Sequence, residues 1–533
     1  MLLLLEMRLS QPGEGFINDS EGRGKWDGLR IPNVLRKLHT YSQLPAVARS
    51  SRARRRAPAR LWTEGGMDML GPTFVGWFGM IRGLWRAGLM AMGLVVLSAP
   101  LFGQLTAEQD RARLLGLLGL KESDMRPRPD GDPRSPHATN YDLAKANVYP
   151  KLPDPLAFKD GRKVKNAAEW AKRAKEIRAD FDAEILGRTP ASLPRVEWHV
   201  VSTKHEEYGG VDVVTKRLAG SVGKGVPGSF DIDLLLTTPA NAKGPVPVMM
   251  ELAFAKDWDM VTSGLLESYV PSPWGVDGKL VVKRGWGFAI LNPLSIQKDD
   301  GSGLTSGIIG LVNHGKPRSV EDWGALKAWA WGAHEALKYF ATDNAVDAKQ
   351  VGLAGHSRFG KAVLVTMAYY PEFAIGYSSS SGEGGAKLYR HIYGETIPNL
   401  CGPSLYHWFD GKFLRYGGPL NAGDLPVDNH ELIALSAPRP VFIAGGSDAG
   451  DGYANPNGDA WADTHGMFLA EVAAGPVYRL MSAKDLGTAE FPKMGTTLST
   501  GELGFQQHDG GHLAEPSWPE FLEFASRYLK ASK

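Results

Sequence analysis

A serine set between two glycines, where an apolar run turns into a helical pattern, constrains the fold of this chain more than any other feature. The apolar run is Val351–Gly355, the letters GHSRFG follow from Gly355, and a helical pattern continues from about Gly360. Small neighbours let the backbone fold sharply between a strand and a helix and lift a hydroxyl into a site. The pattern predicts that Ser357 is a nucleophile, although the second glycine comes one residue later than in G-x-S-x-G. The alternative is a glycine-bounded loop in which the serine caps the helix.

Strand-like runs and amphipathic helical patterns alternate along most of the chain. Such alternation produces a mostly parallel sheet with helices on both faces. We therefore predict the α/β class and an α/β-hydrolase fold, a three-layer sandwich around one central sheet. The strand-like runs cover residues 197–202, 212–220, 230–239, 246–254, 286–292, 351–355, 373–381 and 438–448, and the helical patterns cover 166–187, 318–341, about 360–370 and 517–531.

The clearest helical pattern, over residues 318–341, has a predicted start and a predicted buried face. Ser319 and Asp322 have the spacing of a capping box at the start of a helix. One apolar stripe is formed by Leu326, Ala330, Ala333, Leu337 and Phe340.

The N-terminal residues have the pattern of a processed leader. Residues 1–66 carry 12 Lys/Arg and 6 Asp/Glu, although the whole chain has a net charge of only +2. The basic run RSSRARRRAPAR could be a nucleic-acid arm, but two arginines, a short apolar run and small residues follow Met80, as in a secretory signal. We predict an upstream extension over 1–79, a signal peptide over 80–103 and a single α/β-hydrolase domain over 104–533. Its first part, 104–150, is proline-rich and is predicted to wrap irregularly on the domain.

This arrangement predicts an exported protein, periplasmic or extracellular, with no nucleic-acid partner and no stable membrane anchor, and we expect a monomer. Cys401 is the only cysteine, so the chain can form no internal disulfide and no cysteine-based metal cage. We expect no cofactor and no metal.

A nucleophilic serine needs a histidine and an acid, which this fold supplies in the order serine, acid, histidine. The histidine is expected just before the last helix, where His512 follows two glycines and is preferred over His508. The acid is expected after the strand-like run PVFIAGG, and the pattern leaves four candidates open, Asp448, Asp451, Asp459 and Asp463. The same loop superficially resembles a calcium loop, but it lacks the ligand spacing of an EF-hand.

Four motifs in order resemble the bacterial glucuronoyl esterases of carbohydrate esterase family 15. They are GHSRFGK, SGEGGAKLYRHIYGE, GDAWAD and GGH, and the likeness runs from about Lys151 to the C-terminus. The family cleaves esters between 4-O-methyl-glucuronic acid on xylan and alcohols of lignin, so the resemblance implies glucuronoxylan and lignin–carbohydrate esters as substrates. It implies Ser357 as nucleophile, His512 as base, Arg358 as oxyanion stabiliser, and Lys361, Glu395 and Trp461 as sugar-binding residues.

The resemblance also selects the acid. Some members carry a glutamate directly before the Ser-Gly of the second motif, but here that position is Ser380. The other family position is the first aspartate of DAWAD, which is Asp459, and Glu383 is expected to be a structural carboxylate. The extra residues before Asp459 depart from shorter members.

The two cations after the serine have a physical rationale. A fixed cation beside the reacting carbonyl stabilises the charge that develops in the tetrahedral state, and Arg358 remains charged at all relevant pH values. Lys361 lies about one helical turn from Ser357 and can face the same pocket. Two other functions remain open: another carbohydrate ester hydrolase, such as an acetyl xylan esterase, and a catalytically silent polysaccharide-binding protein.

Overall fold

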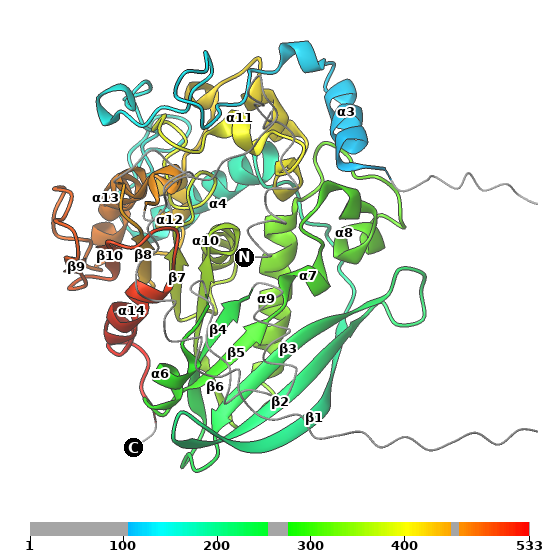
Figure 1. Cartoon of the computed structure of the whole chain (residues 1–533), viewed down its shortest axis with the longest axis vertical. Coiled ribbons are helices and arrows are strands. Elements are labelled where there is room, and N and C mark those ends of the chain that lie inside the picture. The colour runs from blue at the N-terminus through cyan, green and yellow to red at the C-terminus, as the bar shows by residue number, and fades with distance from the viewer. Residues whose placement is uncertain (1–104, 254–274, 449–457, 532–533) are drawn as a thin grey trace, which may run out of the picture. The chain divides into compact units, whose positions relative to one another are not determined.

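A ten-stranded sheet forms the centre of the molecule in the computed structural model, which describes residues 105–253, 275–448 and 458–531 (Figure 1). The strand order is β1-β2-β3-β5-β4-β6-β7-β8-β10-β9, and all neighbours from β5 to β10 run parallel. The other pairs are antiparallel. The strands are β1 Val196–Tyr208, β2 Val211–Val222, β3 Phe230–Pro239, β4 Val246–Leu252, β5 Gly287–Leu291, β6 Val346–His356, β7 Ile375–Ser379, β8 Val441–Gly445, β9 Thr497–Leu498 and β10 Leu503–Gln507.

Helices cover both faces of this sheet because successive strand residues point to opposite sides. In β4, Val248 and Met250 belong to one apolar core and Met249, between them, belongs to the other. The first core is shared with α4, α9, α10, α12 and α13, and the second with α6 and α14. The helices are α3 Ala107–Leu117, α4 Ala167–Glu184, α6 Gly278–Val282, α7 Pro293–Ile296, α8 Gly307–Val312, α9 Ala325–Phe340, α10 Arg358–Tyr369, α11 Ile397–Leu400, α12 Asn429–Ala434, α13 Thr464–Leu480 and α14 Trp518–Ala525.

Two local predictions were wrong. The helix predicted over 318–341 begins only at Ala325, because Ser319 and Asp322 form their own hydrogen-bonded turn before it, with Ser319 N donating to Asp322 Oδ2 at 2.7 Å. The segment 104–150 is not irregular throughout, since it contains α3. Thr106 and Gln109 make a reciprocal capping box at the start of that helix.

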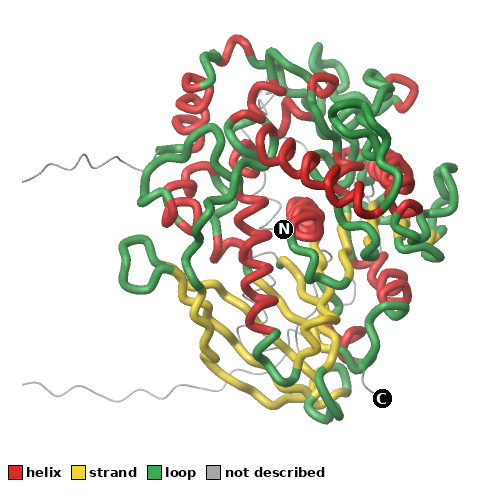
Figure 2. The backbone as a smooth tube through the Cα atoms, turned by 180° about the vertical axis from the view of Figure 1, so that it is seen from behind, coloured by secondary structure: helices red, strands yellow, loops and turns green. Residues whose placement is uncertain are grey.

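The carboxyl ends of four parallel strands place the predicted site residues together. Ser357 follows β6, Ser380 follows β7, the loop to Asp459 follows β8, and the loop to His512 follows β10. Since β6, β7, β8 and β10 are neighbours in the sheet, these four loops open on one edge. Figure 2 shows from behind the strands of the sheet and the helices that pack against them.

The predicted leader lies outside the residues that the structure describes. The boundaries at 79 and 103 and the signal peptide over 80–103 therefore remain predictions. Within the described ranges, no helix is both long and apolar enough to cross a membrane.

Candidate active site

The serine turn forces Ser357 into a backbone conformation that non-glycine residues rarely adopt. Its φ is 55° and its ψ is −124°, at the junction of β6 and α10. The Ser357 N–H donates to the carbonyl of Ser379 on the neighbouring strand at 2.8 Å. Both flanking glycines permit close approach, because a Cβ on Gly355 would lie 2.6 Å from the Phe359 carbonyl oxygen and one on Gly360 would lie 3.0 Å from that of Ser379. Gly360, which comes one residue later than the second glycine of G-x-S-x-G, therefore makes room for the neighbouring strand at this turn.

His512 and Asp459 lie in hydrogen-bond contact beside this turn. His512 Nδ1 is 2.7 Å from Asp459 Oδ1, which leaves the other ring nitrogen for a second partner. Asp459 is 2% exposed, and its Oδ2 accepts hydrogen bonds from Ser380 Oγ at 2.6 Å and Gly446 N at 3.0 Å. The ring centroid of His512 lies 4.4 Å from that of His356, the residue before Ser357. The Asp459 carboxylate is therefore buried, has hydrogen-bond partners at both oxygens, and contacts a histidine next to the serine turn.

The other acid candidates make different contacts. Asp463 binds His391 Nδ1 at 2.6 Å and caps α13 by accepting from Gly466 N. Asp448 accepts from Thr464 N at 3.1 Å, and burial together with the nearby Asp463 charge raises its pKa to about 8. Asp451 and most of the suggested calcium loop lie outside the described residues. Among the described aspartates of this loop, Asp459 is the one that contacts His512, and its role as the acid stays a prediction.

The two neighbouring histidines are buried within the protein. His508 accepts a hydrogen bond from Gly510 N at its Nδ1, and its Nε2 lies 3.1 Å from the Leu513 carbonyl oxygen, so it shapes the loop that carries His512. Burial lowers the pKa of both His508 and His356. They therefore remain neutral at neutral pH and add no charge beside the proposed base.

Two side chains that the sequence patterns do not indicate, Asp299 and Trp408, contact the Arg358 guanidinium. The guanidinium pairs with Asp299 Oδ2, and its centre lies 5.2 Å from the Trp408 ring centroid. Asp299 Oδ1 also accepts from Trp408 Nε1 at 2.6 Å and lies 2.9 Å from His407 Nε2. Burial would raise the pKa of Asp299, but the Arg358 charge and the His407 and Trp408 hydrogen bonds lower it below its usual range. This carboxylate is an ionised anchor for the cation beside Ser357.

Lys361 and Glu395 form a buried ion pair next to the same tryptophan. Lys361 Nζ lies 2.9 Å from Glu395 Oε2, donates to the Glu383 carbonyl at 2.6 Å and lies 5.4 Å from the Trp408 ring centroid. Burial lowers the pKa of Lys361, and the Glu395 charge opposes that shift. Glu383 pairs with Lys387 at 2.5 Å within the protein, as a structural carboxylate would.

The chain is similar in sequence and structure to known carbohydrate esterases. A family model described as fungal glucuronyl esterase matches residues 318–468. A carbohydrate esterase named MZ0003, from an unknown prokaryotic organism, is 32% identical over 434 residues, which span 75% of this chain and 95% of that protein. A solved family 15 glucuronoyl esterase from Teredinibacter turnerae T7901 is 38% identical, with a TM-score of 0.71 over 79% of this chain and 99% of the other. The glucuronoyl esterase from Solibacter usitatus is 32% identical, with a TM-score of 0.62 over 72% and 99%.

The chain belongs to carbohydrate esterase family 15. It is a carboxylic ester hydrolase with the α/β-hydrolase fold, so the family and fold class predicted from the motifs are confirmed.

In this family 15 esterase, Trp461 is tied to the lysine–glutamate pair through the backbone. Its carbonyl accepts from Glu395 N at 2.8 Å, and it lies in a short 3-10 turn, Ala460–Ala462, directly after Asp459. Gly394 has a φ of 58°, and a Cβ there would meet the Trp461 carbonyl. One turn therefore positions both the proposed acid and the tryptophan predicted to line the sugar pocket.

Sequence reasoning missed Asp299, His407 and Trp408. Asp299 belongs to the pair Asp299-Asp300 shortly after β5, and the other two lie in a short 3-10 turn, Tyr406–Trp408, far away in sequence. Neither segment has a recognisable catalytic spacing. The available signals were a carboxylate pair after a buried strand and an aromatic-rich stretch, Tyr406–Phe409.

Proposed function

We propose that this protein is a serine glucuronoyl esterase that hydrolyses esters between the glucuronic acid side chains of xylan and alcohols of lignin. One observation carries the proposal: the Asp459–His512 contact stands beside a strained Ser357 that is followed by two anchored cations. An acyl group that is itself a polar, hydroxylated sugar acid explains why the helix behind the nucleophile begins with Arg358 and buries Lys361 at the pocket.

The first half of the reaction forms an acyl-enzyme. Ser357 Oγ attacks the uronoyl carbonyl carbon while its proton passes to His512 Nε2, because Nδ1 faces Asp459. The tetrahedral intermediate collapses, its carbon–oxygen bond to the alcohol breaks, and the alcohol leaves with the proton from His512. Asp459 remains ionised and stabilises the imidazolium during this transfer.

The second half repeats the chemistry with water. His512 takes a proton from a water molecule, whose oxygen attacks the acyl carbon. Collapse of the second tetrahedral intermediate breaks the bond to Ser357 Oγ, which regains a proton from His512. The products are the free glucuronate and the original enzyme.

Arg358 is proposed to stabilise the oxyanion in both halves. Charge builds up on the carbonyl oxygen only in the tetrahedral states, so a cation fixed beside it lowers the barrier more than it strengthens ground-state binding. Asp299 and Trp408 keep the guanidinium in one place, which removes the cost of reorganising it during the reaction.

Lys361, Glu395 and Trp461 are proposed to hold the sugar of the acyl group. The amine and carboxylate offer a donor and an acceptor for adjacent hydroxyls, and an indole can both stack on a sugar face and donate from its N–H. Because Lys361 and Glu395 are already paired and about nine-tenths or more buried, little reorganisation is needed when the sugar arrives.

Export is part of the proposal, since the predicted substrate is a cell-wall polymer. The predicted signal over residues 80–103 supports it. Sequencing the N-terminus of protein recovered outside the cytoplasm should give a start near Gln104; a secreted protein that keeps residues 80–103 would refute the signal.

A comparison of two esters tests the function. The purified protein should hydrolyse benzyl glucuronate, whose sugar is on the acyl side, and should release little acetate from acetylated xylan, whose sugar is the alcohol. Acetate release without hydrolysis of the glucuronate ester would instead identify an acetyl xylan esterase. Xylan binding without hydrolysis of either ester would indicate a catalytically silent binding protein.

A further inference from the structure

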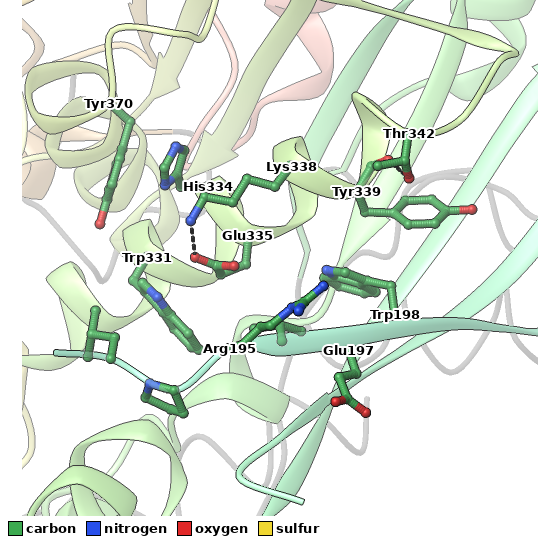
Figure 3. Close-up of a pocket in the computed structure, with 13 residues that line it drawn as sticks. Arg195, Glu197, Trp198, Trp331, His334, Glu335, Lys338, Tyr339, Thr342 and Tyr370 are labelled. Carbon is green, nitrogen blue, oxygen red and sulfur yellow. Dashed lines mark hydrogen bonds and ion pairs between the residues drawn. The ribbon is translucent and has the colours of Figure 1, made fainter.

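An open groove of about 850 Å³ lies between the start of β1 and the second half of α9 (Figure 3). Arg195 and Trp198 extend from the β1 side, and Trp331, Lys338 and Tyr339 extend from α9. None of the residues that line it belongs to the proposed catalytic machinery.

Aromatic rings form much of the lining of this groove. Trp198 and Tyr339 pack with ring centroids 5.7 Å apart, and Tyr370 stacks on His334 at 4.3 Å. Trp198, Tyr339, Tyr370 and His334 are partly exposed, so they present ring surface to the groove. Partly exposed rings with polar edges suit a ligand that has apolar faces and a hydroxylated rim, as a pyranose ring does.

Charged groups lie at the edges of the same groove. Arg195 is exposed and has no ion-pair partner among the described residues, whereas Lys338 is paired with Glu335 at 2.7 Å. An exposed guanidinium is a bidentate donor for a carboxylate. A sugar chain that carries uronate groups therefore complements both the rings and the Arg195 cation.

The groove extends along α9 from Trp331 toward the C-terminal end of the helix, away from the proposed active site. The helix begins at Ala325, directly after Gly324, which abuts the backbone of Trp408 in the proposed active site. Lys338 comes 13 residues after Ala325, and a rise of 1.5 Å per residue places it about 20 Å further along the axis. A ligand bound beside Lys338 would therefore lie apart from an ester at Ser357.

We propose that this groove is a second carbohydrate-binding site, which holds a segment of glucuronoxylan away from the ester being cleaved. The inference rests on the proposed function for its ligand, but not on the catalytic residues. Holding the polymer at one point raises the effective concentration of its esters near Ser357. The groove then contributes to reaction on polymer and not on small esters.

Binding to the catalytically silenced full chain tests the site. In a Ser357→Ala background, we expect Trp198→Ala to weaken binding of glucuronoxylan oligosaccharides about 10-fold by calorimetry, and Trp198→Phe to retain most of it because a ring remains. Arg195→Ala should weaken binding of the uronate-bearing oligosaccharide but not of the neutral xylo-oligosaccharide. Arg134→Ala, which removes an exposed cation already paired with Asp132, is the matched control and should change neither. Unchanged binding in both Trp198→Ala and Arg195→Ala would overturn the proposal.

Kinetics with Ser357 intact separate this proposal from the proposed function. Trp198→Ala and Arg195→Ala should hydrolyse benzyl glucuronate within about twofold of the parent, which also shows that they fold, and should have a raised KM on polymeric glucuronoxylan esters. Equal KM values on the polymer would contradict the second site. Failure of the parent itself on benzyl glucuronate would refute the esterase function, while the binding result would still decide whether the groove takes xylan.

Discussion

The two halves of the proposed active site are built in different ways. The acid–base half, Ser357, His512 and Asp459, sits at the carboxyl ends of neighbouring parallel strands. The cationic half is completed by Asp299 and Trp408, which come from loops with no common spacing. The first half is therefore positioned by the sheet itself, and the second by contacts between loops.

Each half nevertheless uses a buried carboxylate to orient its partner. Asp459 contacts the histidine whose charge changes in the proposed mechanism, whereas Asp299 contacts a guanidinium whose charge stays constant in it. In the proposed mechanism, the Asp459 carboxylate selects the tautomer of His512, whereas the Asp299 carboxylate keeps the Arg358 guanidinium in one position. Variants of the two aspartates should therefore fail in different ways.

The largest difference is expected at Asp459. Asp459→Asn should lower kcat on benzyl glucuronate about 10,000-fold, the usual size of this change in a serine triad, because the amide stabilises the wrong tautomer of His512. Asp448→Asn is the matched control from the same loop and should remain within a few-fold of the parent. Equal losses in the two variants would show that the loop, and not the Asp459 carboxylate, carries the effect.

A smaller loss is expected in the cationic half. Arg358→Ala should lower kcat about 100- to 1,000-fold with little change in KM, because the lost interaction belongs to the tetrahedral state. Asp299→Asn should leave the Arg358 charge in place but no longer fix its position. We therefore expect kcat to fall about 10-fold, within the range for one hydrogen bond to a charged group. If Asp299→Asn were as damaging as Arg358→Ala, Asp299 would act on the reaction directly.

The lysine–glutamate pair should affect binding more than turnover. Glu395→Gln keeps the shape of the side chain and should raise KM for benzyl glucuronate about 10-fold, since hydrogen bonds to charged groups contribute about 1.5–3 kcal/mol. The control is Glu383→Gln, which removes the partner of Lys387 and should lower stability before it changes KM. A change in kcat alone for Glu395→Gln would argue against a sugar-binding role.

The pH dependence of stability should expose the anchor in the cationic half. The folded-state pKa of Asp299 is lowered, so its ionised form stabilises the fold above the unfolded pKa of about 3.9, and this contribution is lost as pH falls through the folded value. At pH 7 the parent should exceed Asp299→Asn by about 1–3 kcal/mol in urea unfolding. The gap should narrow below about pH 4, where the protonated acid resembles the amide. A constant gap from pH 7 to pH 3 would contradict an ionised anchor.

The sequence predicts the acid–base half because its signals are local. GHSRFG marks a strand-to-helix turn, and GGH marks a loop before the last helix. The choice of Asp459 required a family resemblance, since four aspartates in one loop satisfy the same spacing rule. The predicted leader and the domain boundaries lie where the structure describes nothing, and they remain predictions.

The cationic anchors could not be predicted in this way. Asp299 and Trp408 are 109 residues apart, and only the folded chain brings the carboxylate of one to the indole N–H of the other. The late start of α9 has a similar origin. Ser319 and Asp322 hydrogen-bond to each other in a separate turn, so the helix begins only after Gly324. Gly324 lies against the backbone of Trp408, where a side chain would not fit. Both the Asp299–Trp408 contact and the start of α9 depend on tertiary contacts, which local sequence patterns do not indicate.

The most direct test of the central claim is the hydrolysis of benzyl glucuronate by the parent and by Ser357→Ala, with both shown to be folded by circular dichroism. We expect turnover by the parent and a loss of at least about 10,000-fold in the variant, because Ser357 Oγ is the proposed nucleophile that accepts the uronoyl group. Substantial hydrolysis by Ser357→Ala, or none by a folded parent, would contradict it.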